Sequence, residues 1–276
     1  MNNSLLKYLD NLNDCVIIRR DADRTVAKAP AAKDGTPTLF IKVYRHDDFY
    51  SRLQNALHGK TCGKRDLQAC TKLQELDIHV PTPVGYCDDQ PNVLIARKSL
   101  FAAHWLDRIS MATLINSMSG QIKITNQTDL NQAIAAVMTP GGFSVLCSGL
   151  GSFVATLHNK KVYSKDLNVG NILIEIPAPD LIRFFLTDYE NMSFKKQVGR
   201  KKSLSNIIQV CAALMQVDAL ACKDFCSGYA EIRQHFNVLE LEDYIREKAR
   251  QRGALWKEKI DGNFERIADA LKARKA

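Results

Sequence analysis

The sequence predicts an α+β protein in two parts: a small β-rich part with one helix at residues 1–98, and a larger, mainly helical part at residues 99–276. Two observations support this division. Strand patterns dominate the first part, whereas helical periodicity dominates from Ala102 onward. A chain of 276 residues is also too long for one minimal core. With 46% hydrophobic and 25% charged residues, its composition is that of an ordinary globular protein.

The first part reads as a small sheet with one helix. Residues 15–28 form a predicted hairpin around the turn DADR, and residues 37–45 form the next strand. Apolar residues recur at helical steps over residues 64–77, and this helix must end before Pro81 and Pro83. The segments GYC and NVLIARK are then predicted as two further strands.

The second part begins near Arg97–Phe101, where strand patterns give way to helical ones. MTPGGF at 138–143 is a break, and two short strands, YSKDLNVGNILI and IRFFLTDYE, interrupt the helices. The predicted helices cover residues 104–117, 129–138, 144–158, 203–218 and 223–250.

The most informative motif is YSKDLNVGNIL at 163–173. It places Asp166 five residues before Asn171, and Asp188 follows a second apolar strand. Oxygen-bearing side chains are the ligands that Mg²⁺ prefers, and a hydroxyl that attacks a phosphate needs a carboxylate to accept its proton. These three residues therefore predict a site for a divalent cation and a hydroxyl beside a phosphate.

The order of these features resembles the bilobal protein-kinase-like fold, in which a β-rich N-lobe precedes a helical C-lobe carrying D-x-x-x-x-N and a later Asp. The segments FIKVYR, LDIHVPTPVGY and LHNKKVYSKDLNVGNILI bring it closer to one family. They resemble the bacterial lipopolysaccharide kinases, which phosphorylate Kdo and heptose sugars of the inner core. The resemblance covers roughly residues 38–215.

The resemblance implies a role for each motif residue. Asp166 would be the catalytic-loop aspartate that accepts the proton of the sugar hydroxyl. Asn171 would be the catalytic-loop metal ligand, and Asp188 would hold Mg²⁺ against the phosphates of ATP. Lys42 would grip the α- and β-phosphates, with Asp66 as its partner on the helix.

The resemblance also places a hinge between the lobes near Ala96 and Arg97, whose backbone would hold adenine. Three positions depart from the family pattern. Ser164 replaces the catalytic-loop histidine, and Asp66 is one methylene shorter than the usual glutamate, so its helix must lie closer to Lys42. VIIRRDADRTVAK contains no glycine-rich loop, and Arg19, Arg20 or Arg24 would cover the phosphates instead.

The net charge of +8 favours an anionic partner, such as a nucleotide, a phosphorylated sugar or an acidic lipid surface. Nucleic acid is disfavoured because aromatic residues are not interleaved with the basic run at 195–202. Five basic residues between 195 and 202 form either a solvated face or a dock for an anionic glycolipid or leaflet. An apolar stripe from Trp256 to Leu271 either packs on its own domain or lies in a membrane interface.

The eight cysteines form no C-x-x-C pair, which predicts reduced, mostly buried thiols and no zinc site. The sequence has neither a signal peptide nor a membrane-spanning apolar run. We therefore expect a soluble cytoplasmic protein, with peripheral contact to the cytoplasmic face of the inner membrane as a further interpretation.

The leading hypothesis is an ATP- and Mg²⁺-dependent kinase that acts on a Kdo or heptose hydroxyl of the lipopolysaccharide inner core. Two alternatives stay open. One is a small-molecule or protein kinase with the same fold. The other is a nucleotide-binding pseudokinase or scaffold, which the missing glycine loop and Ser164 favour.

Overall fold

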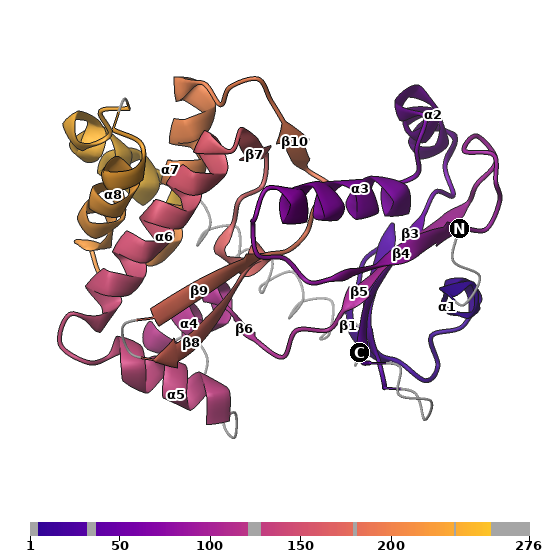
Figure 1. Cartoon of the computed structure of the whole chain (residues 1–276), viewed down its shortest axis with the longest axis horizontal. Helices are drawn as coiled ribbons and strands as arrows, with labels where there is room; N and C mark the ends of the chain where they lie inside the picture. The colour runs from indigo at the N-terminus through magenta and orange to yellow at the C-terminus, as the bar shows by residue number, and fades with distance from the viewer. Residues whose placement is uncertain (1–4, 32–36, 121–127, 179–180, 235, 255–276) are drawn as a thin grey trace, which may run out of the picture. The chain divides into compact units, whose positions relative to one another are not determined.

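The computed structural model describes residues 5–31, 37–120, 128–178, 181–234 and 236–254 (Figure 1). The chain divides into two compact units. The first comprises Met1–Arg108 together with Phe185–Ser193, and the second comprises Ile109–Phe184 and Phe194–Ala276. The predicted α+β class is confirmed. The predicted apolar stripe between 256 and 271 lies outside the described residues.

The first unit is built on a five-stranded antiparallel sheet of order β1-β2-β3-β5-β4. β3 and β5 lie at its centre, and Figure 1 shows α3 running along one face of the sheet. The elements of this unit are α1 (Lys7–Asp10), β1 (Val16–Arg20), β2 (Arg24–Ala29), β3 (Leu39–Arg45), α2 (Phe49–His58), α3 (Cys62–Glu75), β4 (Pro83–Asp88) and β5 (Lys98–His104).

The central position of β3 explains its sequence. Ile41 and Val43 point to one face, where they join a buried apolar cluster with Leu39 and Leu100. Residues two apart share a face of a strand, so Lys42 and Tyr44 point to the other face, and both are buried. A central strand thus carries a lysine into the interior, where the ammonium needs acidic partners.

The strand predicted at NVLIARK is wrong. Val93–Ile95 form a turn in which Leu94 and Ile95 are exposed, and the strand β5 begins at Lys98. β5 pairs with both β3 and β4, so the run of alanines that ends it lies in the sheet. For the same reason the two compact units divide after Arg108, ten residues beyond the expected boundary at residue 98.

The first unit also contains α2, a helix that the sequence analysis omitted. Asp48 caps its first turn by accepting a hydrogen bond from the Ser51 amide, and Gly59 ends it in a left-handed conformation. Its apolar residues Phe49 and Leu57 are 70% and 79% exposed, so they give no core-facing stripe. Only the capping residues signal this helix in the sequence.

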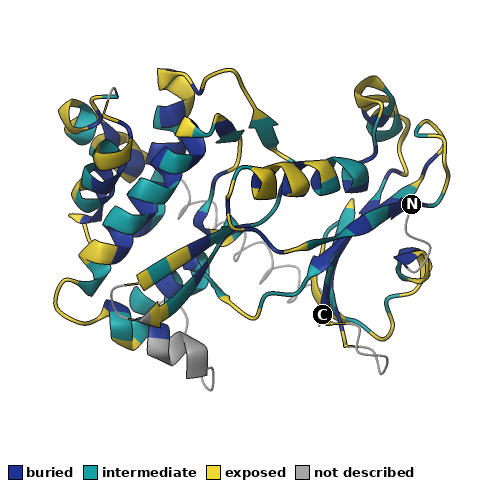
Figure 2. Ribbon diagram, viewed as in Figure 1, coloured by how far each residue is buried: buried dark blue, intermediate teal, exposed yellow. Residues whose placement is uncertain are grey.

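The second unit is mainly helical, and its buried residues follow the facing sides of its long helices (Figure 2). α6 and α8 pack closely, because a Cβ atom added at Gly228 would lie 2.0 Å from the carbonyl oxygen of Ser148. The elements of this unit are β6 (Ile109–Ser110), α4 (Met111–Met118), α5 (Thr128–Val137), α6 (Gly142–Asn159), β7 (Val162–Ser164), η2 (Val169–Asn171), β8 (Ile172–Ala178), β9 (Leu181–Leu186), β10 (Met192–Phe194), α7 (Arg200–Leu214), α8 (Ala221–Ile232) and η3 (Leu239–Leu241); β9 and β10 run across the unit boundaries.

Most predicted helices of this unit are present with shifted ends. The helix predicted at 104–117 begins only at Met111, because β5 continues to His104. The helix predicted at 223–250 is two helices. α8 ends at Ile232, and a further helix runs from residue 242 to the end of the described residues at 254. The break follows Arg233, whose buried guanidinium donates to the carbonyl oxygen of Val198 at 2.6 Å.

Candidate active site

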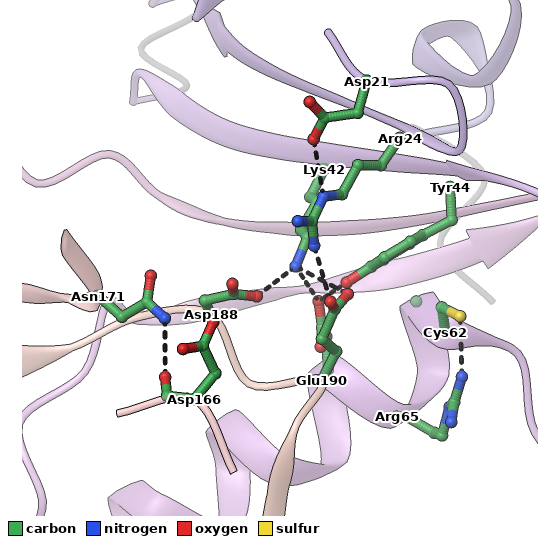
Figure 3. A network of polar contacts seen from close by, with 12 residues as sticks. Asp21, Arg24, Lys42, Tyr44, Cys62, Arg65, Asp166, Asn171, Asp188 and Glu190 are labelled. Carbon is green, nitrogen blue, oxygen red and sulfur yellow. Dashed lines mark hydrogen bonds and ion pairs between the residues drawn. The ribbon is translucent and has the colours of Figure 1, made fainter. Parts of the chain in front are cut away.

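One candidate cluster is a buried group of ion pairs in the first unit (Figure 3). Lys42 from β3 has its Nζ 2.6 Å from Asp188 Oδ1, 3.3 Å from Glu190 Oε2 and 3.7 Å from Asp66 Oδ2. The Lys42 side chain is only 4% exposed. Burial favours the neutral amine, but Asp66, Asp188 and Glu190 outweigh that effect and raise the pKa of Lys42. The ammonium is therefore charged at neutral pH.

Asp188 and Glu190 both reach Lys42 from the segment that follows β9. Tyr189 lies between them in the sequence and packs edge-on against Phe101 at 5.8 Å between ring centroids. Its hydroxyl donates to the carbonyl oxygen of Leu186 at 3.1 Å. The buried tyrosine therefore anchors the segment that carries both acids.

Asp188 adopts a left-handed backbone conformation, with φ of 60°. Aspartate tolerates this region better than most residues, and such strained positions cluster at functional sites. The left-handed residue lies two positions after the end of β9. Of the three acids around Lys42, it is the one nearest to the ammonium.

Asp66 is the most deeply buried acid of the cluster. Tyr44 donates to its Oδ2 at 2.5 Å, whereas its Oδ1 is buried and has no hydrogen-bond partner in the described structure. Burial raises the pKa of Asp66 to about 6, and neither the charge of Lys42 nor the hydrogen bond from Tyr44 cancels this effect. The carboxyl group is thus ionised at pH 7 and half protonated near pH 6.

Gly63 explains how a short aspartate reaches Lys42. It lies one turn before Asp66, at the start of α3, where a Cβ atom would lie 2.5 Å from the carbonyl oxygen of Leu100 in β5. Only glycine lets the helix approach the sheet so closely. The Gly63 amide also donates to Ser99 Oγ at 3.1 Å, which fixes the contact. The closer helix that Asp66 requires is therefore present.

Arg24 extends the cluster on the side of the β1–β2 turn. Its guanidinium donates to Glu190 Oε1 at 2.7 Å and to Asp21 Oδ2 at 3.1 Å. The charges of Lys42 and Arg24 lower the pKa of Glu190, despite the opposing effect of its burial. Two of the three arginines expected to cover phosphates therefore already have acidic partners. Arg24 is held by two acids, and Arg19 pairs with Asp21 at 2.8 Å.

A separate candidate cluster lies in the second unit, on the loop between β7 and η2. Asn171 donates through Nδ2 to the backbone carbonyl of Asp166 at 3.1 Å, so these two predicted residues meet. Gln209 of α7 donates to Asp166 Oδ1 at 2.7 Å. That bond orients the exposed carboxylate from a buried amide and leaves Oδ2 for another partner.

A buried chain of polar groups supports this loop, which has Ser164 where the resemblance to kinases leads us to expect a histidine. Ser164 Oγ accepts from the Asp166 amide at 3.3 Å, and the Ser164 carbonyl accepts from Asn206 Nδ2 at 2.8 Å. His158 contacts Asn206 Oδ1 through Nε2 at 3.1 Å and the Tyr229 hydroxyl through Nδ1 at 2.8 Å.

The directions of these bonds assign the tautomer of His158. Asn206 donates through its amide nitrogen, so its oxygen accepts from the N–H at Nε2 of His158, and Nδ1 accepts from Tyr229. Burial lowers the pKa of His158 to about 4, and the charge of Arg233 acts in the same direction. His158 is thus a neutral histidine packed at the end of α6.

Arg97 is the predicted site residue that joins neither cluster. Its amide donates to Asp89 Oδ1 at 3.0 Å, and its carbonyl accepts from the His46 amide at 2.7 Å. Arg97 immediately precedes the strand β5, so a strand follows it where a hinge was expected. The backbone groups expected to hold adenine are therefore engaged within the first unit, and a role for Arg97 in nucleotide binding stays a prediction.

Sequence reasoning missed Glu190, Tyr44 and Gln209. Glu190 had a visible signal, because it is a second acid two residues after Asp188 in DYE. Tyr44 likewise stands two residues after Lys42, on the same face of a strand. Gln209 lies 43 residues from Asp166, and nothing local in the sequence connects the two.

Comparison with known proteins gives one informative result. No protein-family model matches the sequence. No curated protein matches it either. Among solved structures, the chain is similar to "WaaP in complex with acyl carrier protein", with a TM-score of 0.60 and 13% sequence identity over 86% of this chain and 88% of that chain.

The chain has the WaaP fold. At 13% identity this similarity establishes the fold, and the chemistry depends on the individual residues described above. No described helix is long and apolar enough to cross a bilayer. All eight cysteines are free, and six of them are buried, as predicted.

Proposed function

We propose that this protein transfers the γ-phosphoryl group of ATP to a hydroxyl of a Kdo or heptose sugar in the lipopolysaccharide inner core. One observation carries the proposal: a buried, charged Lys42 is held by Asp188 and Asp66 in a chain with the WaaP fold. The arrangement supports a lysine that binds phosphates and an aspartate that holds their metal ion.

The donor set suits Mg²⁺. Asp188 offers carboxylate oxygens and Asn171 an amide oxygen, the hard ligands that this ion prefers. Among the described residues, no three His, Cys, Asp or Glu side chains could hold a metal ion by themselves. Mg²⁺ takes only one or two protein groups when substrate phosphates supply the rest, so a smaller set suffices. When bound, Mg²⁺ would neutralise charge on the phosphates.

In this proposal Asp166 is the catalytic residue that accepts the proton of the sugar hydroxyl. Gln209 holds Oδ1, so that Oδ2 faces the hydroxyl in a fixed orientation. Lys42 binds the α- and β-phosphates. Asp66 holds the Lys42 ammonium in place, and Tyr44 holds Asp66 through a hydrogen bond. Little covalent help is needed, because phosphoryl transfer depends mainly on positioning and charge.

The test is phosphate transfer from labelled ATP to lipopolysaccharide core acceptors of stepwise length. We expect one acceptor length to take label, and Asp166→Asn to lower the rate by about 10²- to 10⁴-fold, the usual cost of losing a general base. Glu231→Gln is the matched control, because Glu231 is an exposed acid on α8. Unchanged transfer by Asp166→Asn would refute the assignment of the catalytic residue.

A nucleotide-binding scaffold is the second candidate. The β1–β2 turn contains no glycine, and Arg24 is engaged by Glu190 and Asp21. Thermal shift with ATP and Mg²⁺, measured beside the transfer assay, separates the candidates. Binding without transfer to any acceptor, whether sugar, small molecule or protein, would favour the scaffold. Transfer to a protein or small molecule alone would favour a kinase of another substrate class.

Peripheral contact with the inner membrane is part of the proposal. All five basic residues between 195 and 202 are exposed in the second unit. Each contributes about 1 kcal/mol near an anionic surface, so the set supports weak binding. Sedimentation with anionic vesicles tests this: reversing the charges of Lys195, Lys196 and Lys201 should abolish binding, and binding that persists would exclude this segment as the contact.

A further inference from the structure

A cavity of about 290 Å³ lies within the second unit, beside the loop that carries Asp166. Its walls come from α4, residues 168–170, α7 and the helix at 242–254. The volume is at the lower end of the range for small-molecule sites, roughly 300–1,000 Å³, and suits one sugar unit.

Gln209 connects the cavity to the catalytic loop. It lines the cavity and also donates to Asp166 Oδ1 at 2.7 Å. Asn168, two residues after Asp166, lines the cavity as well. Its Oδ1 accepts from the Gly170 amide at 2.8 Å, which fixes the side chain. A ligand in the cavity would therefore lie one side chain away from the proposed catalytic carboxylate.

The polar wall of the cavity consists of amides and one cation. The amides are Asn116, Asn168, Gln209 and Gln216, and the cation is Arg252. The remaining wall is alanine, isoleucine, valine and glycine. Amides both donate and accept hydrogen bonds, so they suit hydroxyl groups, and the apolar wall suits the carbon face of a sugar ring.

Arg252 gives the cavity its charge preference. Among the described residues, no carboxylate lines the cavity and no acid forms an ion pair with Arg252. Its neighbours on the same helix differ, because Arg246 pairs with Glu242 and Arg250 pairs with Glu247. An unpaired guanidinium at an apolar cavity binds carboxylates and phosphates in preference to neutral groups, whereas the positive charge of an amine would be repelled by Arg252.

We propose that this cavity binds the acceptor as an acidic sugar unit, with Arg252 on its carboxylate or phosphate and the amides on its hydroxyl groups. This inference rests on the proposed kinase function, because it names the substrate class of the same site. It also goes beyond that function: neutral sugars and amino sugars should be poor acceptors, and an acidic group on the sugar should determine acceptor choice.

The first test is binding without nucleotide, which does not depend on catalysis. Free Kdo carries a carboxylate, glucose 6-phosphate carries a phosphate, and glucose and glucosamine are the neutral and cationic probes. We expect calorimetry or ligand-observed NMR to detect Kdo or glucose 6-phosphate in preference to the other two. Arg252→Ala should lower the affinity for the acidic probe by about 10- to 100-fold, the range that corresponds to the loss of a hydrogen bond to a charged group.

Arg250→Ala is the matched control, since Arg250 is exposed on the same helix, pairs with Glu247 and does not line the cavity. The comparison of the two acidic probes identifies the anionic group. Equal binding of acidic probes to wild type and Arg252→Ala would overturn the proposal. So would tighter binding of glucosamine, or the absence of binding by both acidic probes at millimolar concentration.

The kinetic test separates this inference from the proposed function. With the acceptor found by the labelling assay, Arg252→Ala should raise KM for the acceptor by 10- to 100-fold and leave KM for ATP unchanged. If transfer occurs and Arg252→Ala has wild-type kinetics, the cavity assignment fails and the kinase function stands. If no acceptor takes label but acidic probes bind through Arg252, the kinase function fails and the sugar site stands.

Discussion

Replacing Asp66 by asparagine should stabilise the fold at neutral pH. Burial raises the pKa of Asp66 from 3.8 to about 6, which corresponds to about 3 kcal/mol at 1.36 kcal/mol for each tenfold change in proton affinity. The folded pKa lies above the unfolded one. The stability that this group contributes is therefore fully present below about pH 3.8 and is lost as the pH rises through about 6.

Asp66→Asn removes this pH dependence and keeps the shape of the side chain. Linkage gives a cost of ionisation of about 2 kcal/mol at pH 5 and about 3 kcal/mol at pH 7.5, for a folded pKa of about 6. The stability of the variant relative to wild type should therefore increase by about 1 kcal/mol between these two pH values. The loss of the Lys42–Asp66 attraction should at the same time weaken ATP binding.

Urea denaturation at pH 5 and pH 7.5 measures the difference directly. Glu75→Gln is the control, because Glu75 lies at the end of the same helix, is exposed and pairs only with Lys72 at the surface. The difference in free energy of unfolding between Glu75→Gln and wild type should be the same at pH 5 and pH 7.5. A flat result for Asp66→Asn as well, or a decrease with rising pH, would refute the assignment of a raised pKa to a buried, half-satisfied carboxyl group.

Three further outcomes are expected. Gly63→Ala should lower the free energy of unfolding in urea by about 1–3 kcal/mol and weaken ATP binding, because its Cβ would meet the Leu100 carbonyl at 2.5 Å. Gly199→Ala is the control and should show neither effect, because a Cβ atom at position 199 has open space. Asn206→Ala should lower the free energy of unfolding by about 1–3 kcal/mol and lower the transfer rate, because it removes the partner of the Ser164 carbonyl and of Nε2 of His158; unchanged kinetics would show that this chain of polar groups does not support the loop. A thiol reagent should find eight free thiols in the denatured protein and only Cys15 and Cys62 reactive in the native one; fast reaction of a third would contradict the burial of the other six.

The sequence predicted the parts of the site that depend on local patterns. Lys42 stands in an apolar run that only a buried strand explains, and Asp166 and Asn171 are five residues apart on one loop. The structure brings Lys42 to Asp188 and Asp66, as expected from the order of the motifs.

The missed features depend on contacts between distant segments. Gln209 reaches Asp166 from α7, and Asn206 reaches Ser164 from the same helix, so neither bond has a local signal. The strand β5 was misplaced because Leu94 and Ile95 are β-formers that the fold leaves exposed, while Ala102 and Ala103 lie inside the sheet. Pairing with two neighbours overrides the intrinsic preference of alanine for helices.

The contact between Gly63 and β5 restricts which residues the chain accepts at position 63. A glycine at position 63 is compatible with either acid at position 66, since a longer side chain can bend, whereas an aspartate at 66 loses its lysine if the helix is held further away. Positions 63 and 66 are therefore coupled in this chain: while residue 66 is an aspartate, no side chain larger than that of glycine fits at position 63 without separating the acid from Lys42.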